Sequence, residues 1–261
     1  MRLVLHLDCD INSSIPINYN YQLSSAIYSL LQFGSPEFSE FLHDRGFKVD
    51  GKKYKLFTFA LRFEKIELKE NHLILKSPKI KLHISSPFID TFIKNFVIGT
   101  FENKVIDITD KDQTIRFRII IAEILPEISF SSKMKFILLS PIVLSTLTEH
   151  NGKMQQYYLR PDDNEEINRV LTKNLLNKKG LLNRNQTLNE YCKLEWDAEY
   201  LQNHRRVTKK ITINENGKFP IDIIGIQSPF TIEGDPDLIK VGYECGFGEK
   251  NSMGFGLAEE V

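Results

Sequence analysis

Apolar positions near the start of the chain change from the two-residue period of a strand to the longer period of a helix. Alternating leucines predict a strand over residues 2–7, with one face buried. Apolar residues at helical spacing between positions 23 and 31 predict a helix. Ser35 followed by Pro36 is a helix-start signal, and it predicts a short second helix that ends at Gly46.

Strand patterns dominate the rest of the first half. Strands are predicted over residues 54–63, 73–84, 105–108 and 115–124, with turns at 49–51 and 70–71. Between them, Ser86 and Pro87 are predicted to begin another helix. The resulting order of strand, helix, strands, helix and strand is close to that of the β-α-β-β-α-β ferredoxin-like unit.

The second half repeats this order more loosely. A strand is predicted over residues 133–139, and "PDDNEEINRVLTKNLLNKKG" predicts a helix. Its first turn is acidic and its last turn holds Lys178 and Lys179 before Gly180 as C-cap, which complements the helix dipole. Strands are predicted over residues 206–213, 219–226, 238–245 and 254–259. We therefore expect an α+β protein of two tandem ferredoxin-like domains that meet near Pro126.

Four glycines lie close together near the end of the chain, in "GFGEKNSMGFG". Glycine lets the backbone take positive φ and approach an anion closely. The known phosphate-binding motifs do not fit, because Lys250 precedes Asn251 where those motifs need serine, threonine or glycine, and because no helix is predicted to follow. The segment is predicted to be a loop between two strands.

Composition and length narrow the class of protein. The 261 residues fit two domains, residues 1–126 and 127–261. Hydrophobic residues make up 41% of the chain and charged residues 26%, as in an ordinary globular protein. The net charge is zero, so a local basic patch must hold any polyanionic partner. Three dispersed cysteines and the lack of a signal peptide or long apolar run predict a cytoplasmic protein without zinc or membrane contact.

The glycine-rich segment, read as "GYECGFGEKNSMGFG", resembles the signature of the repeat-associated RNA-binding (RAMP) superfamily of CRISPR systems. That superfamily has two tandem ferredoxin-like domains. Three segments of the first half, "INYNYQLSSAIYSLL", "FLHD" and "YKLFTFALRF", resemble CRISPR-associated protein six. This family consists of endoribonucleases that cut precursor crRNA within its repeats. Between about residues 64 and 236, the likeness is one of element order alone.

The resemblance implies a cleavage site that works without metal or cofactor. The family places a tyrosine on the first helix, a histidine after the second and a lysine before the next strand, which correspond here to Tyr28, His43 and Lys55. The loop that precedes this strand also carries Lys48, Lys52 and Lys53, so more than one lysine is a candidate.

The chemistry of RNA explains these residue types. The 2′-OH can attack the adjacent phosphate and leave a 2′,3′-cyclic phosphate and a 5′-OH, so the protein needs only proton transfer and charge stabilisation. His43 at a helix C-terminus suits a general acid, and Lys55 suits the developing charge. Tyr28 is assigned to orientation of the sugar or phosphate, with a role as base left as the alternative. Without the resemblance, each fits an ordinary structural or solvent-facing residue.

Three groups of residues are candidates for RNA binding. They are the glycine-rich loop with Gly246, Gly248, Lys250, Gly254 and Gly256; the cluster Arg205, Arg206, Lys209 and Lys210; and Lys133 with Lys135 on one face of a strand. The loop is alternatively a tight turn, and close packing against the first domain is a further role for it. The two basic groups are alternatively solvated strand surfaces.

The sequence thus predicts a metal-independent endoribonuclease whose partner is CRISPR repeat RNA, with other Cas proteins as further partners. A non-catalytic RNA-binding RAMP subunit of an interference complex is the rival hypothesis. A metal-dependent nuclease is a remoter one, because Asp8 and Asp10 lack further ligands at metal-binding spacing.

Overall fold

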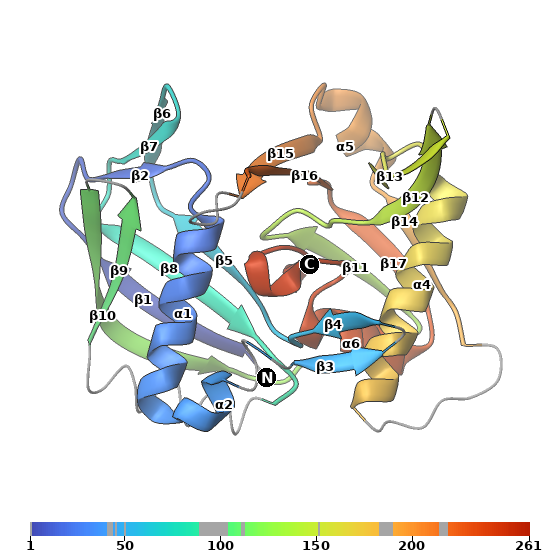
Figure 1. Ribbon diagram of the computed structural model, residues 1–261, viewed down its shortest axis with the longest axis horizontal. Coiled ribbons are helices and arrows are strands. Elements are labelled where there is room, and N and C mark those ends of the chain that lie inside the picture. Colours follow the sequence, from blue (N-terminus) through green and yellow to red (C-terminus); the bar gives the residue numbers. More distant parts are fainter. Residues whose placement is uncertain are drawn as a thin grey trace.

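The computed structural model describes residues 2–40, 44, 46–49, 51–88, 104–110, 113–150, 152–182, 190–213 and 219–261. It is a mixed α+β protein built mostly of strands, with the two halves of the chain side by side (Figure 1). No helix in this described part is both long and apolar enough to cross a membrane.

The first half is organised around a five-stranded antiparallel sheet with the order β5-β8-β1-β10-β9. Its strands are β1 (Arg2–Asp8), β5 (Thr58–Phe63), β8 (Lys79–Ser85), β9 (Val105–Asp110) and β10 (Gln113–Leu125). The predicted strand over residues 2–7 and the two predicted strands between 105 and 124 are confirmed. The odd-numbered leucines of β1 lie in the core, which explains why the alternating pattern was informative.

Helix α1 (Asn20–Gly34) covers one face of this sheet (Figure 1). Its buried positions Leu23, Ile27, Leu30 and Leu31 share a core with β1 and β5, as their helical spacing predicted. Helix α2 (Pro36–Glu40) begins at the predicted proline. The prediction continued this helix to Gly46, and residues 41–43 and 45 of that range lie outside the described residues. Most of the helix predicted to begin at Ser86 and Pro87 also lies outside them.

Two predicted long strands are each broken in two. A hairpin of β3 (Phe47–Val49) and β4 (Lys52–Tyr54) ends before β5, because Leu56 takes a φ of +52°. The strand predicted over residues 73–84 is divided between β7 (His72–Leu75) and β8 by a bend. Strand β7 pairs with β2 (Ser14–Pro16) and with β6 (Ile66–Lys69), and the predicted turn at 70–71 joins β6 to β7.

The second half holds a four-stranded antiparallel sheet with the order β14-β17-β11-β18. Its strands are β11 (Lys133–Leu138), β14 (Cys192–Trp196), β17 (Phe230–Gly234) and β18 (Ala258–Glu260). Helices α4 (Asn164–Leu181) and α6 (Pro236–Cys245) share its core, and α5 (Ala198–Asn203) follows β14. Two hairpins extend from this half: β12 (Ser145–His150) with β13 (Lys153–Tyr158), and β15 (Thr208–Ile213) with β16 (Ile221–Ile226).

The strand predicted over residues 238–245 is wrong, because this segment is helix α6. Asp235 caps the helix by accepting a hydrogen bond from the Leu238 amide, and Pro236 occupies its first turn. Consequently the glycine-rich segment does not join two strands. It connects α6 to β18 and contains a short 3₁₀ turn over Asn251–Met253.

The two halves are held together by buried polar contacts around α6. Arg2 of β1 is 2% exposed, donates from Nη2 to the Tyr243 carbonyl oxygen at 2.8 Å, and lies 3.4 Å above the Tyr243 ring. Ser85 of β8 donates to the same carbonyl at 3.1 Å. A guanidinium buried in this way needs these partners, since an unpaired buried charge is costly. The relative placement of the two sheets therefore depends on Arg2.

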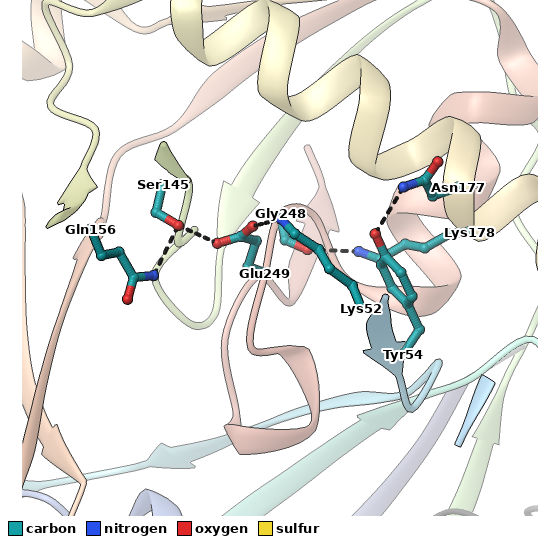
Figure 2. Close-up of polar contacts among 8 residues, drawn as sticks. All are labelled: Lys52, Tyr54, Ser145, Gln156, Asn177, Lys178, Gly248 and Glu249. Carbon is teal, nitrogen blue, oxygen red and sulfur yellow. Dashed lines mark hydrogen bonds and ion pairs between the residues drawn. The ribbon is translucent and has the colours of Figure 1, made fainter. Parts of the chain in front are cut away.

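Lys178 and Lys179 lie in the last turn of α4 as predicted, but the helix continues past Gly180, which is therefore not its C-cap. Lys178 also makes buried tertiary contacts. Its ammonium is buried and donates to the carbonyl oxygens of Gly246 and Gly248, both at 2.7 Å, and to Asn251 Oδ1 at 2.8 Å. Figure 2 shows the contact with Gly248. Lys179, also assigned to the dipole, is buried in an ion pair with Glu190 at 2.9 Å. Both lysines are therefore tertiary contacts rather than solvated charges at a helix end.

Burial lowers the pKa of Lys178 to about 8, against the raising effects of Cys245 and Glu249. Between pH 8 and the ordinary lysine pKa, the unfolded chain binds a proton that the folded protein has lost. Stability contributed by this group therefore rises with pH in that window.

We predict that Lys178→Met lowers the free energy of unfolding by about 1–3 kcal/mol at neutral pH, because three buried oxygens lose their donor. The deficit should grow by up to about 1.4 kcal/mol per pH unit between pH 8 and 10. Urea unfolding of both proteins across this range measures it. Lys173→Met, an exposed lysine of the same helix, is the matched control, and equal pH slopes for all three proteins would contradict the assignment.

Candidate functional site

The glycine-rich loop, residues 246–256, lies at the centre of the molecule, between the two halves (Figure 1). Gly246, Gly248, Gly254 and Gly256 are all buried and all have positive φ, between +75° and +89°. A Cβ on Gly248 or Gly256 would collide with a backbone carbonyl oxygen of Val143 or Phe247. The glycines therefore allow close packing. A Cβ on Gly254 would meet the ring of Phe59 in β5, so the loop also packs against the first half, one of the roles considered for it beside RNA contact and a tight turn.

The loop packs against the first helix through a line of polar side chains. Asn20 and Ser24 donate to the carbonyl oxygens of Met253 and Ser252, each at 2.8 Å. One turn further along α1, Tyr28 is hydrogen-bonded to the Ser252 side chain. These three helix residues are four positions apart and share one face of α1, so the helix and the loop position one another.

A cavity of about 770 Å³ opens beside this contact. Its walls come from the β3–β4 hairpin, α4, the β12–β13 hairpin and the glycine-rich loop. The lining residues are Lys52, Lys53, Tyr54, Lys55, Leu56, Ser145, Thr146, Leu147, Gln156, Arg169, Val170, Lys173, Asn174, Asn177, Lys178, Gly248, Glu249, Lys250, Asn251, Ser252 and Met253. Residues from both halves of the chain thus meet here, and the lining is strongly basic.

Glu249 joins the walls of the cavity (Figure 2). Its Oε1 accepts from Lys52 Nζ at 3.0 Å, and its Oε2 accepts from Ser145 Oγ at 2.6 Å. Gln156 in turn donates to Ser145 Oγ at 3.0 Å. The carboxylate therefore links the β3–β4 hairpin of the first half to the β12–β13 hairpin of the second.

Lys55 is the candidate lysine with the most altered environment. It is half-buried in the cavity wall, where burial, reinforced by Lys53, lowers its pKa to about 8 against the raising effect of Asp44. The exposed Lys52 and Lys53 have other partners, since Lys52 pairs with Glu249 and Lys53 donates to the Asp44 carbonyl at 3.0 Å. Lys48 is exposed on β3 and does not line the cavity.

Tyr28 lies beside the cavity rather than in its lining. Its ring packs edge-on against Phe57, with 5.6 Å between the ring centroids, and burial raises the pKa of its hydroxyl. Its partner Ser252 lines the cavity together with Lys55, so two of the three predicted catalytic residues are brought to the same region. The third, His43, lies outside the described residues.

The predicted RNA-binding residues divide between the cavity and the surface. Exposed Lys250 lines the cavity. Lys133 and Lys135 are exposed on β11 but pair with Glu233 and Asp197, each at 3.1 Å. Four further cations are exposed and outside the cavity lining: Arg205 and Arg206, which follow α5, and Lys209 and Lys210, which lie in β15. Lys210 pairs with Asp222 at 3.1 Å.

Sequence reasoning missed the contribution of α4 to this site. Arg169 and Lys173 are exposed and line the cavity one turn apart. Their spacing of four residues was a usable signal, because it places two cations on one face of a predicted helix. The structure also explains Asp8 and Asp10, which share Arg118 at 2.9 and 3.2 Å. Among the described residues, no group of histidine, cysteine or acidic side chains is arranged to hold a metal.

Comparisons with known proteins agree across the whole chain. The family model described as "CRISPR associated protein Cas6, C-terminal" matches residues 125–260, and that described as "CRISPR-associated protein Cas6, N-terminal" matches residues 14–118. The chain is similar to "CRISPR-associated endoribonuclease Cas6 1" of Methanocaldococcus jannaschii, at 34% identity over 100% of this chain and 93% of that protein.

Solved structures give the same result. The structure titled "CRISPR associated protein Cas6" has a TM-score of 0.74 and 31% identity, with 100% of this chain and 99% of the other covered. A second, titled "Characterization of a Cas6-related gene from Pyrococcus furiosus", has a TM-score of 0.82 and 24% identity over 100% of this chain and 98% of the other, and supports the fold alone. The chain therefore belongs to the Cas6 family of CRISPR-associated proteins.

Proposed function

We propose that this protein is an endoribonuclease that binds CRISPR repeat RNA and cleaves precursor crRNA within its repeats. The supporting observation is the full-length similarity to a protein named an endoribonuclease, together with a basic cavity where Lys55, Lys250 and the Tyr28–Ser252 contact come together. Reduced, buried cysteines without a disulfide fit a cytoplasmic location.

We also propose that residues 1–126 and 127–261 are two ferredoxin-like domains. If β9 is set aside, the core strands of the first half lie in the order second, third, first, fourth along the chain (β5-β8-β1-β10). The sheet β14-β17-β11-β18 of the second half has the same order. A helix follows the first strand in each half, as the β-α-β-β-α-β unit requires.

The proposed reaction is attack of a 2′-OH on the neighbouring phosphate, without metal. The 2′-OH loses its proton to hydroxide from solvent. The 2′-oxygen forms a bond to phosphorus while the bond to the 5′-oxygen breaks, which yields a 2′,3′-cyclic phosphate and, once the leaving oxygen is protonated, a 5′-OH. His43 donates a proton to the leaving 5′-oxygen, and Lys55 stabilises negative charge on the phosphoryl oxygens. Partial burial of Lys55 in the cavity wall strengthens this electrostatic contribution, because charges interact more strongly away from bulk water.

Tyr28 fits the orienting role better than the role of base. Its raised pKa keeps the hydroxyl protonated near neutral pH, so it has little tendency to accept a proton. Its contacts with Phe57 and Ser252 instead hold the hydroxyl and the loop in one arrangement. We assign Tyr28 to positioning of the RNA backbone through that arrangement.

Binding of the RNA is assigned first to the cations of the cavity rim: Lys52, Lys53, Arg169, Lys173 and Lys250. The exposed cluster of Arg205, Arg206, Lys209 and Lys210 is assigned to a more distant part of the RNA. Lys133 and Lys135 are weaker candidates because they lie on β11, outside the cavity lining. Ion pairs do not separate the two groups, since Lys52 pairs with Glu249 and Arg169 with Glu166. The four glycines belong to the loop that carries Lys250, and all four are buried. We therefore assign them to support of this loop.

A non-catalytic RNA-binding subunit is the rival function, and the same cavity would serve it. The half-buried Lys55 favours the enzyme, because a lysine held at a lowered pKa has no advantage for simple phosphate binding. The two functions differ in whether bound repeat RNA is cut.

The nucleophile provides the direct test. We expect repeat RNA with a single 2′-deoxy nucleotide upstream of the scissile phosphate to bind about as tightly as all-ribose RNA, because one hydrogen bond contributes only about 1 kcal/mol. It should remain uncut in EDTA and in magnesium alike, and a 2′-deoxy nucleotide elsewhere in the RNA is the control. Cleavage of the blocked RNA, or an upstream 3′-OH, would show that water attacks; binding of all-ribose RNA without cleavage would identify the non-catalytic subunit.

His43→Ala should slow single-turnover cleavage by about 10²–10⁴-fold, the usual contribution of general acid–base catalysis. Its affinity for the blocked RNA should stay within about twofold of wild type, because the proton is transferred only in the transition state. His150→Ala, on an exposed strand end of the β12–β13 hairpin, is the matched control. A parallel loss of affinity in His43→Ala would assign the histidine to structure or binding.

Lys55 should lose its charge as pH rises through about 8. Because arginine keeps its charge, the cleavage rate of Lys55→Arg relative to wild type should rise by up to about tenfold between pH 7 and pH 9. Taking this ratio cancels the ionisation of the 2′-OH, which affects both proteins. Lys53→Arg is the control, and its rate relative to wild type should not change with pH. If the ratio rises for Lys53→Arg and stays constant for Lys55→Arg, the assignment of this role to Lys55 is wrong.

A further inference from the structure

We propose that the cavity between α4 and β4 is a base-reading pocket that takes one unpaired nucleotide of the bound RNA, with Asn174 as its reading residue. The inference rests on the proposed function in one respect, which is that the ligand is RNA. It adds where the RNA must be single-stranded and which side chain contacts the unpaired base.

The size and the walls of the cavity fit a nucleotide. A volume of about 770 Å³ lies in the range of pockets that enclose ligands of drug size. Tyr54, Leu56, Leu147 and Val170 provide aromatic and apolar surface for the faces of a base. Proteins read RNA sequence mainly on unpaired bases, which are stacked on such surfaces and hydrogen-bonded at their edges.

The charges around the pocket fit the phosphates on either side of that nucleotide. Arg169 and Lys173 project from α4, while Lys53 and Lys250 approach from the hairpin and the loop. Glu249 is the one acid among the lining residues, and its carboxylate oxygens already accept from Lys52 and Ser145. Phosphates therefore meet an excess of cations at the rim.

Asn174 is the feature that points to a base. It lines the pocket at 7% exposure, and its Oδ1 is buried without a hydrogen-bond partner among the described residues. The other lining asparagines have visible structural bonds: Asn177 donates to the Tyr54 hydroxyl at 3.1 Å, and Asn251 accepts from Lys178 and donates to Phe247 and Phe255. A buried acceptor left unsatisfied costs stability, so the site of Asn174 is suited to a ligand that supplies the missing donor.

The chemistry of an amide fits the edge of a base. A primary amide presents one acceptor and one donor side by side. Its complement is a donor beside an acceptor, which adenine and cytosine carry as an exocyclic amine beside a ring nitrogen, and guanine and uracil as a ring N–H beside a carbonyl oxygen. The pocket is therefore expected to bind the edge of one unpaired base through Asn174.

The test uses the uncleavable repeat RNA, with each base of the repeat removed in turn, and measures affinity. For wild type, we expect one position at which loss of the base weakens binding by about tenfold. Asn174→Leu should weaken binding of the intact RNA by about the same factor and become insensitive to the base at that position. Such coupling distinguishes base reading from general damage to the site.

Thermal melting is a separate control for whether Asn174→Leu folds normally. Asn174→Leu replaces an unsatisfied amide by an apolar side chain of similar size and should melt no lower than wild type. Asn164→Leu, exposed in the first turn of α4 and away from the pocket, is the matched control and should keep the base dependence. RNA with 2-aminopurine at the sensitive position should become more fluorescent when it binds wild-type protein, because the base leaves its stacked neighbours. The same RNA should not show this increase with Asn174→Leu.

Three outcomes would overturn the inference. The base-reading pocket would be eliminated if Asn174→Leu kept the wild-type dependence on the base, or if wild type had no sensitive position. In either case, cleavage of all-ribose RNA would still support the endoribonuclease. Failure of the protein to bind any repeat RNA would instead overturn the proposed function together with the pocket.

Discussion

The buried ammonium of Lys178 is the contact on which the arrangement of the site depends. It binds three oxygens of the glycine-rich loop, from Gly246, Gly248 and Asn251, within 2.8 Å. An ammonium has three N–H donors, so one lysine satisfies three acceptors that would otherwise be buried without partners. Because Lys178 belongs to α4, the helix that forms one wall of the cavity also sets the conformation of the loop that forms another.

This anchored loop connects the two halves. On one side it contacts Asn20, Ser24 and Tyr28 of α1, and on the other Glu249 joins Lys52 to Ser145. The four glycines make the loop compact rather than mobile, since their positive φ values allow backbone to pack against backbone. Rigid support of this kind is what a positioned tyrosine and lysine need, because small displacements of reacting groups are costly in rate.

The packing of the loop also places the cations of the cavity in two environments. Lys55 is half-buried and has a lowered pKa, whereas Arg169, Lys173 and Lys250 are exposed at the rim. Exposed cations attract RNA from solution, and the half-buried one is suited to charge that develops in the reaction. A chain with no net charge thereby obtains a strongly basic cavity, because acidic side chains elsewhere pair with surface lysines such as Lys133 and Lys135.

Sequence alone determined the elements whose pattern is local: the alternating leucines of β1, the apolar stripe of α1, the proline at the start of α2 and the family resemblance of both ends of the chain. It misassigned residues 238–245, because the N-cap at Asp235 lies before the apolar run that was taken as a strand. Only the tertiary structure decided the contacts of Lys178, the burial of Asn174 and the basic cavity around them. Those roles depend on burial and on partners far away in the chain, and no local spacing of residues encodes which distant atoms a side chain meets.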